Sequence, residues 1–335
     1  MESPLFVAAV LVIAGVLTLE FGISSAITEL VAGMLLALFV DVTPMGWLKF
    51  LAHFGMLGLM FMAGFEVDVA VVRRTWRESL GIGLSTTSLA LVFHFLKERD
   101  LLEGETGQTI LGAAMVVDIL SMMGMALLLG EVGWGTLIFF AAAAPAVWNL
   151  PRVGEWIFRR YRGSVVEFEL RFLLLVLVGL GFLAEHVGIH AAVVSFAVGL
   201  ILAEVVQDHL ALEEKMKGIV FSFLAPIFFL RAGTQIQMRQ LDLSTLGMGS
   251  LFLLVAVGLK YGGTFLAARW LQPGLGHFAG ILFNYRLTFG IITATVGVQE
   301  GLFDQRLFSI ILLVVLASAL MPMVLLRDLP SELLE

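Results

Sequence analysis

The sequence contains no cysteine and few charged residues. Without cysteine, the 335-residue chain has no disulfide and no thiolate metal ligand. Only 14% of its residues are charged, whereas a soluble domain carries about a quarter, so lipid replaces water over much of the surface. No basic block indicates nucleic acid binding. An enzyme is not expected either, because no nucleophile–base pair, metal set or phosphate-binding loop is found.

Long apolar runs are what the sequence has instead, with 59% hydrophobic residues. Runs of about 20 residues match the ~30 Å hydrocarbon core that a helix must cross, and the period-two alternation of barrel strands is absent. We therefore expect an all-α polytopic membrane protein. Pro4–Leu19 lacks a basic n-region and a cleavage site, so it reads as a retained span. The expected spans are 4–20, 24–41, 47–68, 79–96, 107–130, 132–149, 167–186, 188–206, 216–237, 244–270, 275–299 and 305–327.

A polar stretch divides these twelve spans into two groups of six. We predict a first membrane half over 1–149, a cytoplasmic linker over 150–166, a second half over 167–327 and a short cytoplasmic tail over 328–335. The linker is assigned to the cytoplasm because basic residues in short loops mark that side of the membrane. Its basic residues and proline are Pro151, Arg152, Arg159, Arg160 and Arg162.

The basic loops conflict with twelve simple spans. Arg73, Arg74 and Arg77 after the third span and the linker after the sixth both indicate the cytoplasmic side, although three crossings should change sides. Either 79–96 is a re-entrant hairpin or one whole span is absent between Arg77 and Ser79. From the linker onward the pattern is consistent, and it places the C-terminus inside.

Asp118 is the sharpest candidate for a functional residue within a span. It lies in GAAMVVDILSMM (112–123), and no charge occurs in the seven residues before it or the ten after it. Ionisable residues within spans are costly and mark ion pathways. A carboxylate there can hold either a proton or a metal cation, which is the minimal chemistry of exchange. The alternative is a protonated Asp118 that hydrogen-bonds a neighbouring helix.

Two cations also lie within spans. Lys260, in LLVAVGLKYGGTFLAARWL (253–271), either pairs with a carboxylate or sheds its proton on burial, and a structural ion pair is the alternative. Arg286, in FNYRLTFGIIT (283–293), stays charged and is expected to be a fixed counter-charge or a structural clamp. Glu29, Glu66, Glu185 and Arg231 lie nearer span ends.

Polar residues interrupt one span in each half. The first cluster is Ser85, Thr86, Thr87 and Ser88, whose hydroxyls and freed carbonyls are oxygen ligands suited to Na⁺ or K⁺. Bonding of these hydroxyls to their own helix is the alternative. The second irregular place is Asn284–Gly290, with Asn284, Arg286 and Thr288. Interrupted spans in corresponding positions indicate a binding site between inverted repeats.

Six segments in order resemble the second branch of the bacterial monovalent cation:proton antiporters, which have a sodium/proton exchanger fold. ITELVAGMLLAL (27–38) and FGMLGLMFMAGFEVDVAVVRR (54–74) are similar to the family's first two motifs. STTSLALV with GAAMVVDIL is similar to its broken helix and acidic helix. The remaining similarities are LAEHVGIHAAVVSFAVGLILAE (183–204), EEKMKGIVFSFLAPIFFLRAG (213–233), and Lys260 followed by NYRLTFG.

The resemblance implies a homodimer in the bacterial inner membrane that works by alternating access, with a mobile core in which two broken helices cross. By position, Asp118 matches the ion-binding aspartate, Ser85–Ser88 the broken helix and Lys260 the membrane lysine. The expected substrates are a monovalent cation, Na⁺ or K⁺, and H⁺, and no cofactor is expected. The sequence leaves the choice between Na⁺ and K⁺ open.

Three departures from the family pattern change these expectations. Val117 stands where electrogenic members have a second acid, so we expect Asp118 alone to carry exchange and transport to be closer to electroneutral. Thr288 replaces the acid of the second broken helix. Only about ten residues, Val69–Glu78, stand where the family has a full helix, in agreement with the conflict between the basic loops.

Two other functions remain open at this point. One is a potassium-efflux antiporter of the same fold. Those proteins usually carry a nucleotide-binding domain after the last span, where this sequence has only Arg327–Glu335. The other is a membrane scaffold or sensor that kept the fold without transport.

Overall fold

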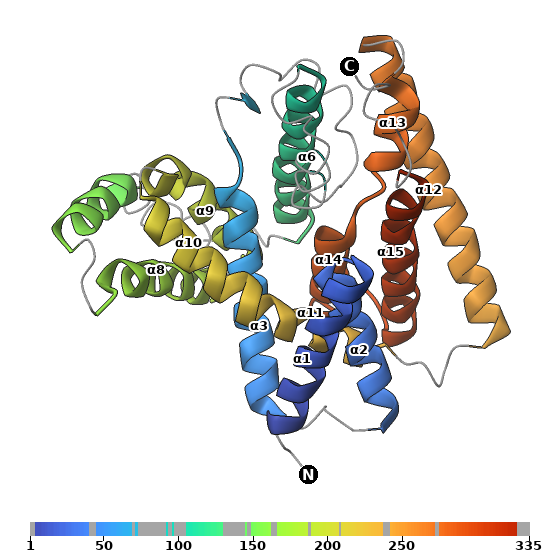
Figure 1. Ribbon diagram of the computed structural model, residues 1–335, viewed down its shortest axis with the longest axis horizontal. Coiled ribbons are helices and arrows are strands. Elements are labelled where there is room, and N and C mark those ends of the chain that lie inside the picture. Colours follow the sequence, from blue (N-terminus) through green and yellow to red (C-terminus); the bar gives the residue numbers. More distant parts are fainter. Residues whose placement is uncertain are drawn as a thin grey trace. The chain divides into compact units, whose positions relative to one another are not determined.

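The computed structural model describes residues 4–39, 45–68, 71–72, 92, 96, 105–129, 145, 149–161, 166–186, 189–207, 209–236, 242–271 and 275–326. Within this part of the chain all regular structure is helical, which confirms the all-α prediction (Figure 1). The helices of the first half are α1 (Pro4–Phe21), α2 (Ser25–Phe39), α3 (Gly46–Phe65) and α6 (Glu105–Leu129). Those of the second half are α8 (Phe168–Glu185), α9 (Ala191–Gln207), α10 (Leu210–Ile219), the π-helical η1 (Val220–Leu224), α11 (Ala225–Thr234), α12 (Leu243–Leu271), α13 (Leu275–Leu282), α14 (Leu287–Gln299) and α15 (Gln305–Leu325).

Ten of the twelve expected spans have helical counterparts among these elements, and residues 79–96 and 132–149 lie largely outside the described residues. Six helical segments in the described part are long and apolar enough to cross a membrane, and the bent pair α13–α14 makes a seventh. α2 and α9 are shorter apolar helices. The chain therefore has the composition and helix lengths of a polytopic membrane protein.

The chain folds into two compact units that interleave the two halves of the sequence. Unit 1 comprises Met1–Pro44, Asp68–Ser121 and Phe229–Glu335, and unit 2 comprises Met45–Val67 and Met122–Phe228. Unit 1 therefore holds α1, α2, α12–α15 and most of α6, and unit 2 holds α3 and α8–α10. Each unit draws on residues from both halves.

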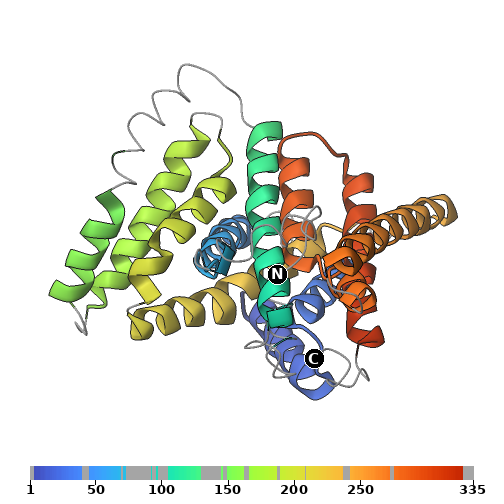
Figure 2. The ribbon, with the colours of Figure 1, turned by 90° about the horizontal axis from the view of Figure 1, so that it is seen from above.

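Close glycine contacts hold the core of unit 2 together. A Cβ atom at Gly64 of α3 would collide with the carbonyl oxygen of Phe196 in α9, and one at Gly199 would collide with that of Phe61. Glycine is needed here because it alone lets two backbones approach so closely. In the same unit α8 and α9 lie side by side (Figure 2).

The expected span 216–237 is more irregular than its apolar pattern suggests. It begins at Leu210, and a π-helical turn over Val220–Leu224 separates α10 from α11. Pro226 follows two residues later. It has no N–H to donate to the carbonyl oxygen of Ser222, and its ring would clash with that carbonyl in a regular α-helix. The wider π turn accommodates this clash.

In unit 1, α12 buries Thr245, Lys260 and Thr264, whereas its Ser244 and Ser250 are exposed. In the C-terminal half of α12, which ends at Leu271, the buried residues are Lys260, Thr264 and Ala268, at a spacing of four. Most of its other apolar residues are exposed, as expected where lipid covers a helix. Helix α13 packs on α12 through Gly276 and Gly280, which leave space for the rings of Phe265 and Tyr261.

Candidate ion-binding site

Asp118 lies near the middle of the 25-residue helix α6, where the charge-free run of the sequence places it. Its side chain is only 1% exposed, and Val117 and Met115 beside it are also buried. Burial of an ionised carboxylate is costly unless a cation or hydrogen-bond donors compensate the charge. Asp118 is thus a buried acid whose charge state depends on what lies next to it.

Lys260 brings a buried ammonium group into the same unit. The side chain is 4% exposed, and among the described residues its Nζ has no hydrogen-bond partner. Its charge interacts with that of Asp118 and with that of Arg286. The three residues come from α6, α12 and the start of α14, so the fold gathers into one electrostatic cluster residues that are far apart in sequence.

Arg286 is the N-cap residue of α14 and is anchored to α12. Its Nη2 donates a hydrogen bond to the carbonyl oxygen of Ala256 at 2.9 Å and a longer one to Asn284 Oδ1 at 3.4 Å. Asn284 is fully buried, and its Nδ2 donates to the carbonyl oxygen of Gly280 at 2.8 Å. These bonds fix both sides of the gap between α13 and α14.

That gap is a break in a membrane helix. α13 and α14 are bent by 42° at residues 283–286, and Arg286 has non-helical backbone angles of −124° and 31°. The irregular place expected at Asn284–Gly290 is therefore real, although the interruption begins at residue 283 and α14 resumes at Leu287. A broken helix exposes the carbonyl groups of one end and the N–H groups of the other, which supply partial charges for ions.

The other expected site residues have different outcomes. Ser85, Thr86, Thr87 and Ser88 lie outside the described residues. Thr288 is half-buried in the first turn of α14. In the described part of the chain, no group of three or more His, Asp or Glu residues is arranged to hold a metal ion.

The charged residues expected near span ends also have different environments. Glu29 of α2 is buried, whereas Glu185 faces His53 at 3.4 Å within unit 2. The carbonyl oxygen of Ala256 is a part of the site that the sequence could not reveal, because a backbone acceptor has no residue signature.

A bundle of membrane-length helices with a buried acid, one buried and one half-buried cation and a broken span defines the class of ion-coupled secondary transporters. The profile of the sodium/hydrogen exchanger transmembrane family matches residues 6–84 and 79–327. The chain belongs to this family, as the resemblance of its motifs indicates. It is therefore a member of a transporter family and not an enzyme. The two matched stretches meet at 79–84, beside the place where the sequence is expected to lack a helix.

Curated relatives extend over most of the chain. A Methanocaldococcus jannaschii protein named probable Na⁺/H⁺ antiporter 3 is 25% identical over 91% of this chain and 90% of its own length. An Enterococcus hirae Na⁺/H⁺ antiporter is 22% identical, with 92% of both chains covered. A high-affinity Na⁺/H⁺ antiporter of Synechocystis is 27% identical over 90% of this chain and 67% of its own.

Proposed function

We propose that this protein exchanges a monovalent cation, Na⁺ or K⁺, for H⁺, and that the carboxylate of Asp118 binds the two in turn. The observation that carries the proposal is the burial of Asp118 at 1% exposure within a cluster that also contains Lys260 and Arg286. The names of the relatives, which are Na⁺/H⁺ antiporters, support the cation and the proton as substrates.

Exclusive binding follows from the cost of an uncompensated charge in this place. An ionised carboxylate that is buried needs either a proton, which removes the charge, or a cation, which balances it. A proton and a metal cation cannot both bind tightly to the same carboxylate oxygen atoms at the same time. Because Val117 supplies no second acid, one carboxylate carries the exchange, and we propose one proton per cation.

The proposed transport step is alternating access between two inverted repeats. Its support is a repeated four-residue pattern: Leu30–Gly33 in α2, Phe61–Gly64 in α3, Phe196–Gly199 in α9 and Leu230–Gly233 in α11. In unit 1 the glycines of α2 and α11 each lie against the carbonyl of the other's leucine, and in unit 2 those of α3 and α9 lie against the carbonyl of the other's phenylalanine. Inverted repeats predict matching motifs of this kind in the two halves of the sequence.

Assembly and placement belong to the same proposal. We place the protein as a homodimer in the bacterial inner membrane, with the C-terminus in the cytoplasm. The basic residues of the linker support this sidedness through the positive-inside rule.

K⁺ remains a specific second candidate for the cation. A Bacillus cereus relative that is named a Na⁺/H⁺–K⁺ antiporter is 22% identical over 92% of this chain and 90% of its own. Hydroxyl, carbonyl and carboxylate oxygens serve either ion, and the size of the cavity decides between them.

The test is cation-driven proton movement in proteoliposomes with Na⁺, K⁺ or Li⁺ in turn. We expect wild-type exchange with at least one cation and at least a hundred-fold loss in Asp118→Asn, whose amide cannot take the proton. Asp304→Asn is the matched control, because Asp304 caps α15 and asparagine caps as well. Equal activity of Asp118→Asn and wild type would reject the assignment, and no exchange with any cation would favour a scaffold.

A further inference from the structure

We propose that the exposed face formed by residues 149–161 and 166–168 binds the headgroups of anionic phospholipids. We call this surface the linker face, and it belongs entirely to unit 2. The proposal does not depend on the exchange chemistry of Asp118. The residues of the linker face are Arg152, Val153, Trp156, Arg159, Arg160, Tyr161, Val166 and Phe168.

The linker face is one side of an amphipathic helix that is fixed to unit 2. Residues 149–160 are helical, and the exposed positions recur at spacings of three and four. The opposite side is buried: the ring of Phe158 lies 6.3 Å from that of Phe172 in α8 and 5.4 Å from that of His209. Packing of that side therefore orients the arginines outward.

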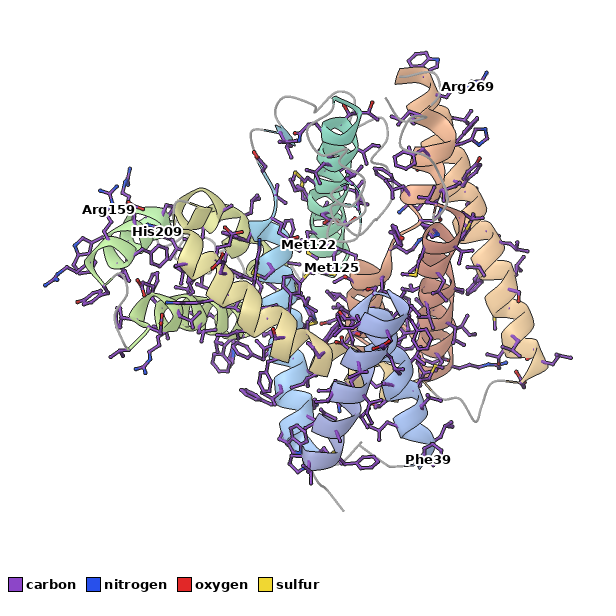
Figure 3. The ribbon with its side chains drawn as sticks, in the orientation of Figure 1. Phe39, Met122, Met125, Arg159, His209 and Arg269 are labelled. Carbon is purple, nitrogen blue, oxygen red and sulfur yellow. The ribbon has the colours of Figure 1, made fainter. Side chains whose placement is uncertain are left out.

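Two acidic residues near this helix, Glu155 and Glu167, are already paired. Glu155 forms an ion pair with Arg159 and faces His209 Nε2 at 3.4 Å. Figure 3 labels Arg159 and His209 in this part of unit 2. Glu167 accepts a hydrogen bond from Lys215 Nζ at 2.6 Å. Among the described residues, Arg152 and Arg160 then have no carboxylate partner, although the chain carries a net charge of −7. The linker face thus offers positive charge to an external anion.

Three exposed aromatic rings accompany these cations near the start of α8, which lies in the expected span 167–186. Trp156 is 60% exposed, and its ring is 6.3 Å from that of Tyr161, which is 4.7 Å from that of Phe168. The guanidinium of Arg160 is 5.7 Å from the Tyr161 ring. Phe168 is the first residue of α8, so the three rings lie near the beginning of this apolar helix.

This combination matches a phospholipid headgroup region better than the alternatives. Exposed Trp and Tyr favour the boundary between headgroups and acyl chains, and guanidinium groups bind phosphate. Each cation near an anionic leaflet strengthens binding about five-fold. A soluble acidic partner would explain the arginines but not the exposed Trp156, Val153 and Phe168 at the start of the expected span 167–186.

The test measures quenching of Trp156 fluorescence, in a protein whose other five tryptophans are replaced by phenylalanine, by brominated phosphatidylglycerol and, separately, by brominated phosphatidylcholine. Both are titrated into the purified full-length protein in detergent. We expect half-maximal quenching at a much lower share of phosphatidylglycerol than of phosphatidylcholine. Arg152→Gln/Arg160→Gln should weaken that preference roughly 25-fold, since two cations are lost. Arg159 is left intact because it pairs with Glu155.

Lys49→Gln/Arg269→Gln is the matched control, because it removes two exposed positive charges outside the linker face. It should keep the wild-type preference. For the unmodified protein, raising the ionic strength with N-methylglucamine chloride should remove the preference, since salt screens exposed charges.

Equal quenching by the two lipids in the wild type would overturn the proposal. So would an equal loss of preference in the test and control variants. A change of oligomeric state in Arg152→Gln/Arg160→Gln without any lipid preference would instead assign the face to a second copy of the chain.

Discussion

At the scale of single residues, Arg286 at the helix break has no ion-pair partner among the described residues and donates to the carbonyl oxygen of Ala256 instead. Thr288, where the family resemblance places an acid, contributes no negative charge beside it. A helix N-terminus favours negative charge, and Thr288 is in the first turn of α14 directly after Arg286.

We therefore predict that Thr288→Glu stabilises the protein. The new carboxylate would lie beside the Arg286 guanidinium and at the positive end of α14, which should raise the free energy of unfolding by about 1 kcal/mol. The measurement is thermal unfolding in detergent at neutral pH. Thr288→Gln is the matched control, with nearly the same shape and no charge. Equal midpoints for the two variants would show that the positive charge is already balanced.

At the scale of helices, glycine position decides whether an added methyl group is tolerated. Gly199 of α9 lies against the backbone of Phe61, which cannot move aside, whereas no atom outside its own helix lies within 4 Å of the position that a Cβ would take on Gly179 of α8. We predict that Gly199→Ala lowers the free energy of unfolding by about 1–3 kcal/mol. Gly179→Ala should raise it by about 0.4–1 kcal/mol, because alanine restricts the unfolded chain.

Denaturant titration of the two alanine variants in the same detergent measures whether each substitution raises or lowers the free energy of unfolding. If Gly199→Ala were as stable as Gly179→Ala, the close crossing of α3 and α9 would be refuted. The same comparison then bears on the reciprocal pairing that supports the inverted repeats.

The capped start of α12 gives a prediction about pH. The side chain and backbone N–H of Thr245 donate to Asp242 Oδ1, the Ser244 hydroxyl also donates, and Arg306 lies 3.3 Å away; together these lower the pKa of Asp242 to about 2. Because the folded pKa lies below the ordinary value of about 3.9, this stabilisation is present above about pH 4 and is lost as the pH falls toward 2.

Asp242→Asn should therefore show a smaller drop of unfolding temperature than wild type between about pH 4.5 and pH 2.5. Asparagine can still cap the helix, so the variant isolates the titration from the cap. Parallel pH curves for the two proteins would show that Asp242 does not titrate in this window.

The apolar pattern predicts helices well and irregularities less well. α12, expected at 244–270 and found at Leu243–Leu271, shows how closely a long apolar run fixes a span. The break before α14 is also predictable, because Asn284 and Arg286 are polar residues within such a run. The π turn at Val220–Leu224 is missed, although Pro226 signals it, since a proline's effect on the preceding turn depends on how the neighbouring helix packs.

The sequence does not reveal contacts between residues that are far apart in the chain. No pattern in the chain indicates that Arg286 bonds to the carbonyl oxygen of Ala256, thirty residues away. Likewise, the sequence names Asp118, Lys260 and Arg286 separately as charged residues within spans. Only packing of α6, α12 and α14 brings their charges within reach of one another.

At the scale of the whole molecule, the family match extends over nearly the whole chain. The two matched stretches cover residues 6–84 and 79–327, and two compact units each contain helices from both halves. The proposed exchange needs one buried carboxylate that is offered to each side of the membrane in turn. Its central claim is that cation and proton compete for Asp118.

The most direct test of that claim is the pH dependence of the apparent KM for the transported cation, measured from exchange rates over a range of cation concentrations in proteoliposomes. Competition for one carboxylate predicts that KM rises about ten-fold for each unit of falling pH on the acid side, while the maximal rate extrapolated to saturating cation stays nearly constant. Two competing protons would give about a hundred-fold rise. A KM that does not change with pH would contradict the account, because the proton and the cation would then occupy different sites.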